Sequence, residues 1–137
     1  MCSDHPFDRR QFLSLLLCSV LAACGGNGVG EERPDSPPQH WKGLDIRVET
    51  RPSPPHEGMA EFLVIVTTDN GRPGWDCIID VRTSDQDEWK QCIQDGRVGV
   101  YRRAALVNGA DRSTVQVQVK RREDTTVLYF PLKVSAG

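Results

Sequence analysis

The sequence feature that most constrains the fold is a strict alternation of apolar and polar side chains near the C-terminus. Between residues 113 and 121, Val115, Val117 and Val119 alternate with polar residues. A period of two residues points successive side chains to opposite faces of a strand, so this segment predicts a strand with one buried face. Residues 44–50 have the same period and predict a second strand of this kind.

Seven such segments, separated by clusters of turn residues, account for the chain after residue 40. The predicted strands cover residues 44–50, 61–67, 76–83, 88–94, 98–107, 113–121 and 125–134. Short strands at regular spacing, with no helical pattern between them, predict an all-β, immunoglobulin-like sandwich of seven strands. The segment 61–67 is apolar on both faces, which predicts a central strand.

One predicted strand has an uncertain register. Straight alternation across residues 98–107 would place Arg103 on the same face as Tyr101. A charged side chain does not suit a core face, so we expect a β-bulge near Arg102 and Arg103. The segment from Asp95 to Tyr101 resembles the tyrosine corner of immunoglobulin-like sandwiches, although no cysteine follows at position 103, so the antibody-type disulfide is absent.

The beginning of the chain has the composition of an export signal. Arg9 and Arg10 precede a run of apolar and small residues from Phe12 to Ala23. A helix needs about 20 apolar residues to cross a bilayer, and this run is too short for that. A short apolar segment behind a basic start predicts a cleaved, helical secretory signal peptide.

The end of the apolar run resembles the lipobox of bacterial lipoproteins. Leu21, two alanines and Cys24 give the aliphatic, small, small, cysteine order of that motif. The resemblance implies that a lipid is attached to the thiol of Cys24, that residues 1–23 are removed and that the new amino group is acylated. Acyl chains of this kind anchor a protein stably to a membrane. Gly25 stands where an aspartate favours inner-membrane retention in this family, so we expect the periplasmic side of the outer membrane.

Arg9 and Arg10 are compatible with two export routes. Arg9 and Arg10, followed by Gln11, Phe12 and Leu13, resemble the twin-arginine signal, which carries folded proteins. The same two arginines also suit the basic start of a general secretory signal.

The segment after the lipobox has no apolar pattern. Residues 25–40 are rich in glycine, proline and charge, which predicts a disordered linker. The expected organisation is therefore a signal peptide at 1–23, the lipidated Cys24 with its linker at 24–40, and a sandwich domain at 41–137.

The remaining cysteines predict a disulfide. Cys2 and Cys18 fall within the predicted signal peptide, which leaves Cys77 and Cys92 in the domain. An even pair in an oxidising compartment predicts one bond between them. A metal-binding pair and two buried thiols are the alternatives.

Composition and motifs argue against several classes of function. The net charge is −2, so no basic surplus suggests nucleic-acid binding. The chain has no Gly-X-Ser-X-Gly motif, and His40 and His56 lie in proline-rich segments, where a preorganised catalytic base is not expected. We therefore expect a non-catalytic protein without a cofactor.

Metal binding has only a weak signal in the sequence. His56 and Met59, three residues apart, are the candidate copper ligands, since copper accepts imidazole and thioether donors. The order of the proline-rich turn at 51–55, the strand at 62–66 and the turn at 69–73 resembles the YtkA-like and FixH-like extracytoplasmic modules. Some of those modules are linked to copper or to cytochrome oxidase assembly.

Two functions follow as expectations. The first is an envelope lipoprotein, attached to the membrane through Cys24, that binds another envelope protein or a polymer. The alternative is an accessory protein for copper handling or cytochrome oxidase assembly, with His56 and Met59 as its ligands.

Overall fold

The structure, a computed structural model, describes residues 36–109 and 113–135. Every described residue lies within one compact unit, Arg33–Gly137. The predicted signal peptide with Arg9 and Arg10, the lipidation site Cys24 and the linker up to residue 35 lie outside the described residues. These assignments stay predictions.

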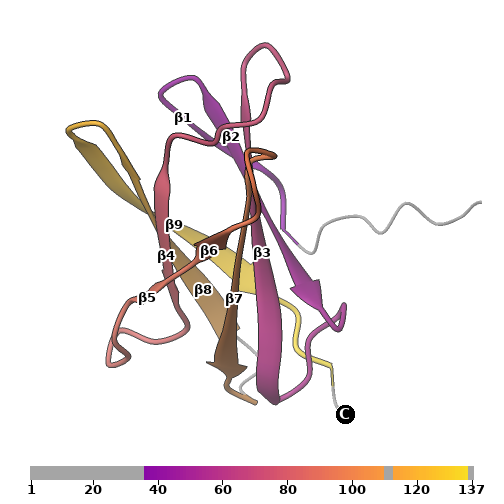
Figure 1. The fold of residues 1–137 in the computed structure, drawn as a ribbon. Helices are drawn as coiled ribbons and strands as arrows, with labels where there is room; N and C mark the ends of the chain where they lie inside the picture. The colour runs from indigo at the N-terminus through magenta and orange to yellow at the C-terminus, as the bar shows by residue number, and fades with distance from the viewer. Residues whose placement is uncertain (1–35, 110–112, 136–137) are drawn as a thin grey trace, which may run out of the picture. The chain divides into compact units, whose positions relative to one another are not determined.

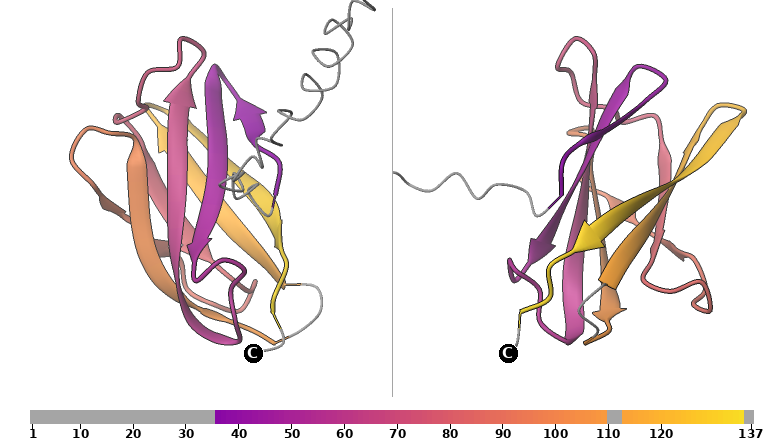
Figure 2. Two further views of the ribbon diagram at one scale, coloured as in Figure 1. Left: turned by 90° about the vertical axis from the view of Figure 1, so that its right-hand side faces the viewer. Right: turned by 180° about the vertical axis from the view of Figure 1, so that it is seen from behind.

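The described residues form two antiparallel sheets that enclose one apolar core (Figures 1 and 2). The five-stranded sheet has the order β1 (Gln39–Trp41), β2 (Leu44–Arg51), β3 (Gly58–Thr68), β7 (Val100–Val107) and β6 (Ile93–Gln94). The four-stranded sheet has the order β5 (Lys90–Gln91), β4 (Ile78–Arg82), β8 (Ser113–Arg121) and β9 (Asp124–Leu132). The predicted all-β class is confirmed. Within the described ranges no helix is long and apolar enough to cross a membrane.

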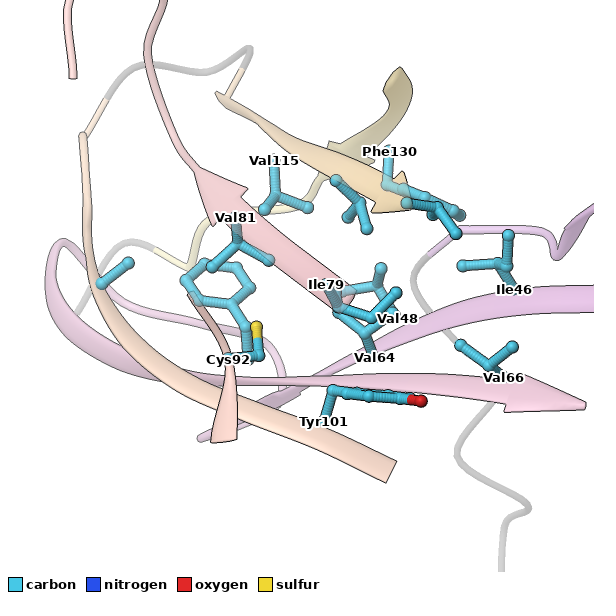
Figure 3. Close-up of a cluster of buried hydrophobic side chains, with 14 of the residues drawn as sticks. Ile46, Val48, Val64, Val66, Ile79, Val81, Cys92, Tyr101, Val115 and Phe130 are labelled. Carbon is cyan, nitrogen blue, oxygen red and sulfur yellow. The ribbon is translucent and has the colours of Figure 1, made fainter. Parts of the chain in front are cut away.

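The alternation in the sequence places the core between the sheets. Val48 and Val64 point inward from the five-stranded sheet, while Ile79, Val115 and Phe130 point inward from the four-stranded sheet (Figure 3). Each of these side chains is at most 3% exposed. Burying a side chain of this size contributes about 1.5–3 kcal/mol, so the two-residue period supplies the driving force for closing the sheets.

Strand β3 is the central strand that the sequence predicts. It pairs with β2 on one side and with β7 on the other. Leu63 lies on its outer face, opposite Glu49 of β2 and Arg102 of β7, and is still only 5% exposed. An apolar residue on the outer face is therefore buried as well, which explains why this segment does not alternate.

The predicted strand 88–94 is wrong as a single element. Residues 90–91 pair with β4, whereas residues 93–94 pair with β7 in the other sheet. The change of sheet occurs at Cys92, whose backbone N–H donates to the carbonyl oxygen of Ile79 at 2.8 Å. A local pattern of residues cannot reveal this change, because each half has ordinary strand composition.

The structured domain begins earlier than predicted. Gln39 and His40, which the sequence places in the linker, belong to β1 at the edge of the five-stranded sheet. The side chain of Gln39 also donates to the carbonyl oxygen of Tyr129 in β9, at 2.6 Å. Ser36 is only 3% exposed. Pairing with β2 thus orders residues that their composition alone would leave in a linker.

The bulge expected near Arg102 and Arg103 is absent. The register between β3 and β7 runs without interruption from Gly58 opposite Val107 to Ile65 opposite Val100. Arg103 therefore has the inward orientation of a core residue, yet its side chain is exposed. The reason is that β6 pairs with β7 only at residues 101 and 102, so the edge of the sheet is open beside Arg103.

Tyr101 anchors a connection between the sheets. Its hydroxyl donates to the carbonyl oxygen of Gly74 at 2.8 Å and accepts the backbone N–H of Cys77 at 3.2 Å. The resemblance to a tyrosine corner implies a bond a few residues upstream of the tyrosine. The structure instead joins Tyr101 to the segment that leads from β3 into β4. Burial raises the pKa of this phenol to about 12.

Candidate binding surfaces

The structure does not contain the predicted disulfide. Cys77 and Cys92 are both free thiols, and each is 7% exposed within the core cluster. The backbone N–H of Cys92 donates to the carbonyl oxygen of Ile79 in β4, and Cys77 lies directly before that strand. The alternative of two buried thiols agrees with this arrangement.

The environment of both thiols suppresses their ionisation. Desolvation by burial is the largest cause, and it raises the pKa of Cys92 to about 12. Burial also raises the pKa of Cys77, and the nearby carboxylate of Asp76 adds to the increase. Because thiolates are the reactive form of cysteine, these residues behave as core side chains.

The two candidate copper ligands lie at the surface. His56 is exposed just before β3, and Met59 is 65% exposed near the start of that strand. Gly58 lies between them with a φ of 118°. Within the described ranges no group of three His, Cys, Asp or Glu side chains gathers where it could hold a metal ion.

An exposed apolar surface lies on the outer face of the five-stranded sheet. Met59 of β3 is opposite Leu106 of β7, and Ile93 of β6 is opposite Arg102 of β7. Met59, Leu106 and Ile93 are 65%, 53% and 68% exposed. A hollow of about 610 Å³ adjoins this face; Met59, Ile93 and Ala104 line it from the five-stranded sheet, and Lys90 of β5 lines it from the other sheet. We call Met59, Ile93, Leu106 and this hollow the apolar hollow.

The rim of the apolar hollow carries more positive than negative charge. Lys90, Arg102 and Arg103 line it together with Glu61. Arg102 pairs with Asp95 at 3.5 Å, whereas Lys90 and Arg103 pair with no carboxylate among the described residues. An apolar surface with two uncompensated cations on its rim can bind a partner that presents apolar and acidic side chains together.

This surface is not evident from the sequence alone. Ile93 lies in a short polar segment, and the sequence around Met59 suggests either a metal ligand or a side chain at the edge of the core. The sequence does contain a signal for it, because Met59 and Leu106 both occupy positions whose side chains alternate toward the outer face of their strands. It becomes visible only when the register places β3, β7 and β6 side by side.

Comparison of the chain with protein-family models, with curated proteins and with solved structures found no match.

Proposed function

We propose that this protein is a lipid-anchored, non-catalytic binding module of a bacterial envelope, exported by residues 1–23 and attached to the membrane through Cys24. The domain at the end of its linker binds another envelope protein. The single observation that carries the binding function is the apolar hollow with its two unpaired cations, Lys90 and Arg103.

The proposal includes an immunoglobulin-like arrangement of the sandwich. Support comes from the strand order, in which β2, β3, β7 and β6 face β5, β4, β8 and β9. A Greek-key sandwich of this class has its first, second, fifth and fourth strands in one sheet. Strand β1 is then an addition at the edge, and the divided segment at Cys92 supplies one short strand to each sheet.

The chemistry of the apolar hollow specifies the partner. Exposed aliphatic and thioether side chains favour an apolar residue of the partner, because association removes this surface from water. Lys90 and Arg103 favour aspartate or glutamate beside that residue, and their attraction acts mainly on the rate of association and on specificity. The expected partner segment is therefore acidic and amphipathic.

The anchor is tested by metabolic labelling with a palmitate analogue. Wild-type protein should incorporate the label and fractionate with membranes, whereas Cys24→Ala should do neither. Equal labelling of the two proteins would contradict the anchor without bearing on the binding surface.

The contact surface is tested by photo-crosslinking in intact cells. A photoreactive residue at position 59 should capture a specific partner, and one at the exposed position 125 of the other sheet should not. The double substitution Lys90→Glu and Arg103→Glu should abolish the capture. Lys133→Glu is the matched control, because Lys133 is also exposed and forms no ion pair with a described residue. Equal capture at positions 59 and 125 would contradict the proposed surface.

A further inference from the structure

We propose that a second hollow, on the outer face of the four-stranded sheet, binds an uncharged oligosaccharide. This hollow has a volume of about 400 Å³. Its lining includes the side chains of Thr83, Ser84, Asp85, Thr114, Gln116 and Tyr129. We call it the polar hollow. It shares no lining residue with the apolar hollow, so this proposal is independent of the partner protein.

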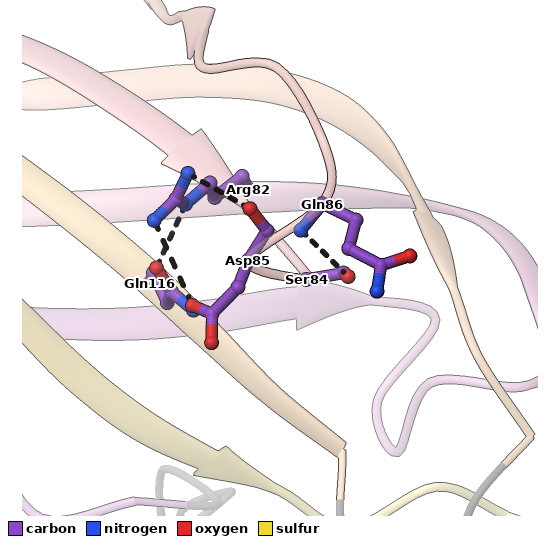
Figure 4. Close-up of polar contacts among 5 residues, drawn as sticks. All are labelled: Arg82, Ser84, Asp85, Gln86 and Gln116. Carbon is purple, nitrogen blue, oxygen red and sulfur yellow. Dashed lines mark hydrogen bonds and ion pairs between the residues drawn. The ribbon is translucent and has the colours of Figure 1, made fainter.

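A fixed hydrogen-bond network forms one side of the polar hollow (Figure 4). Arg82 donates from Nε to the amide oxygen of Gln116 at 2.8 Å, and Gln116 donates from Nε2 to Oδ1 of Asp85. Gln116 is 6% exposed although it lies on the outer face. The ring of Trp89 lies 4.3 Å from the guanidinium carbon of Arg82 and fixes it from another side. The network therefore restrains the side chain of Asp85 through its Oδ1.

Asp85 presents an acceptor to the solvent from this network. Its side chain is 82% exposed, and Figure 4 shows one carboxylate oxygen directed toward Gln116 and the other away from it. The second oxygen has no hydrogen-bond partner among the described residues. A carboxylate with one fixed and one open oxygen is suited to accept a hydroxyl hydrogen of a sugar.

Tyr129 lines the polar hollow together with this acceptor. Tyr129 of β9 is directly opposite Gln116 of β8 in the register, and its side chain is 56% exposed. A pyranose ring has hydroxyl groups around its edge and C–H groups on its faces. The aromatic ring can contact the C–H face of the sugar while the hydrogen-bonding groups of the hollow contact its hydroxyl groups.

The hydroxyl groups of the polar hollow can serve as donors and as acceptors. The hydroxyl oxygen of Thr83 lies 2.6 Å from the carbonyl oxygen of Leu106 and 3.2 Å from Oδ2 of Asp87, so its single hydrogen is engaged and it can serve a ligand only as an acceptor. Ser84 accepts the backbone N–H of Gln86 at 3.2 Å, which leaves its hydrogen available. Sugar hydroxyls also donate and accept. This match favours a polyol over a ligand that can only donate or only accept.

The charge of the lining excludes acidic sugars. Among the described lining residues there is no lysine or arginine, and Asp85 carries a negative charge. The nearest cation, Arg82, is engaged by Gln116 and by Asp85. An acidic sugar would find no unpaired cation in the polar hollow, so the neutral oligosaccharide is the expected ligand.

The experiment is a titration of the full chain with a tetramer of β-1,4-linked N-acetylglucosamine, followed by calorimetry and by backbone amide shifts. Shifts should concentrate at the start of β8 and in β9, at up to about 10 mM sugar, the range for a millimolar Kd. Tyr129→Ala should weaken binding about tenfold, whereas Tyr129→Phe should retain it. Asp85→Asn should also weaken it, and Met59→Ala on the other sheet should not change it.

Three results would overturn the proposal. The first is the absence of amide shifts in β8 and β9 at the highest sugar concentration. The second is binding that Tyr129→Ala leaves unchanged while circular dichroism shows a folded protein. The third is equal or tighter binding of a galacturonate tetramer, because the polar hollow offers its carboxylates no unpaired cation.

Discussion

The hydroxyl oxygen of Tyr101 lies 2.8 Å from the carbonyl oxygen of Gly74, to which it donates a hydrogen bond across the interior of the domain. The two residues are 27 positions apart in the chain, and Tyr101 is 1% exposed. This bond connects the segment between β3 and β4 to β7. It thereby links the five-stranded sheet to the segment that leads into the four-stranded sheet.

Tyr101→Phe should destabilise the domain by about 1–3 kcal/mol, because it leaves the buried polar groups of Gly74 and Cys77 without their partner. Urea unfolding of the variant should show a lower midpoint with an unchanged slope. Tyr129→Phe is the control, and its exposed hydroxyl should contribute less than about 0.5 kcal/mol. Equal midpoints for the two variants would mean that the buried bond contributes nothing.

Gly99→Ala should destabilise the protein more than Gly96→Ala. Both glycines have positive φ values, 73° and 58°, so each substitution costs about 1–2 kcal/mol in backbone strain. An added Cβ at Gly99 would also collide with the carbonyl oxygen of Val66 and lie 2.9 Å from the nitrogen of Gly74. The space around Gly96 is open.

The collision at Gly99 should add about 1–3 kcal/mol, measured as the difference in unfolding free energy between the two variants. If Gly96→Ala proved equally destabilising, the close approach of Gly99 to β3 would be contradicted.

Cys77 and Cys92 should remain unmodified in the folded protein at pH 8 and react after unfolding. Burial protects both thiols, and a pKa of about 12 at Cys92 leaves almost no thiolate. Alkylation followed by peptide mapping of the full chain measures each cysteine separately. Detection of a Cys77–Cys92 disulfide in protein isolated without reductant would support the pairing that the sequence predicts and contradict the free thiols.

The stability contribution of His40 should decrease as pH rises. Nδ1 of His40 lies 2.8 Å from Asp45, and Nε2 lies 3.7 Å from Asp69. The hydrogen bond to Asp45 is the main cause that raises the pKa of His40 above 6.5, and the charge of Asp69 adds to it. The folded state therefore binds the proton more tightly than the unfolded state does, and the stabilisation is complete below pH 6.5 and lost as pH rises through the folded pKa.

An NMR titration of the His40 ring should give a pKa above 6.5 in the wild type, and Asp45→Asn should lower it. A value at or below 6.5 in the wild type would contradict the ion pair. The exposed position of the ring predicts that salt weakens the effect.

The sequence by itself determined the class of fold and most of the strands. The alternation at Val115, Val117 and Val119 and the two-sided apolar character of β3 are consequences of local chain geometry, so the residues alone reveal them. Turn residues fixed most strand boundaries within a few positions.

Tertiary structure decided everything that depends on which strands become neighbours. The change of sheet at Cys92, the pairing of Gln39 in β1 and the exposure of Arg103 at an open edge follow from long-range register. Both hollows also arise in this way, since Met59 meets Leu106, and Gln116 meets Tyr129, only across paired strands. Local propensity cannot encode such contacts, because the free energy that selects them comes from packing between distant segments.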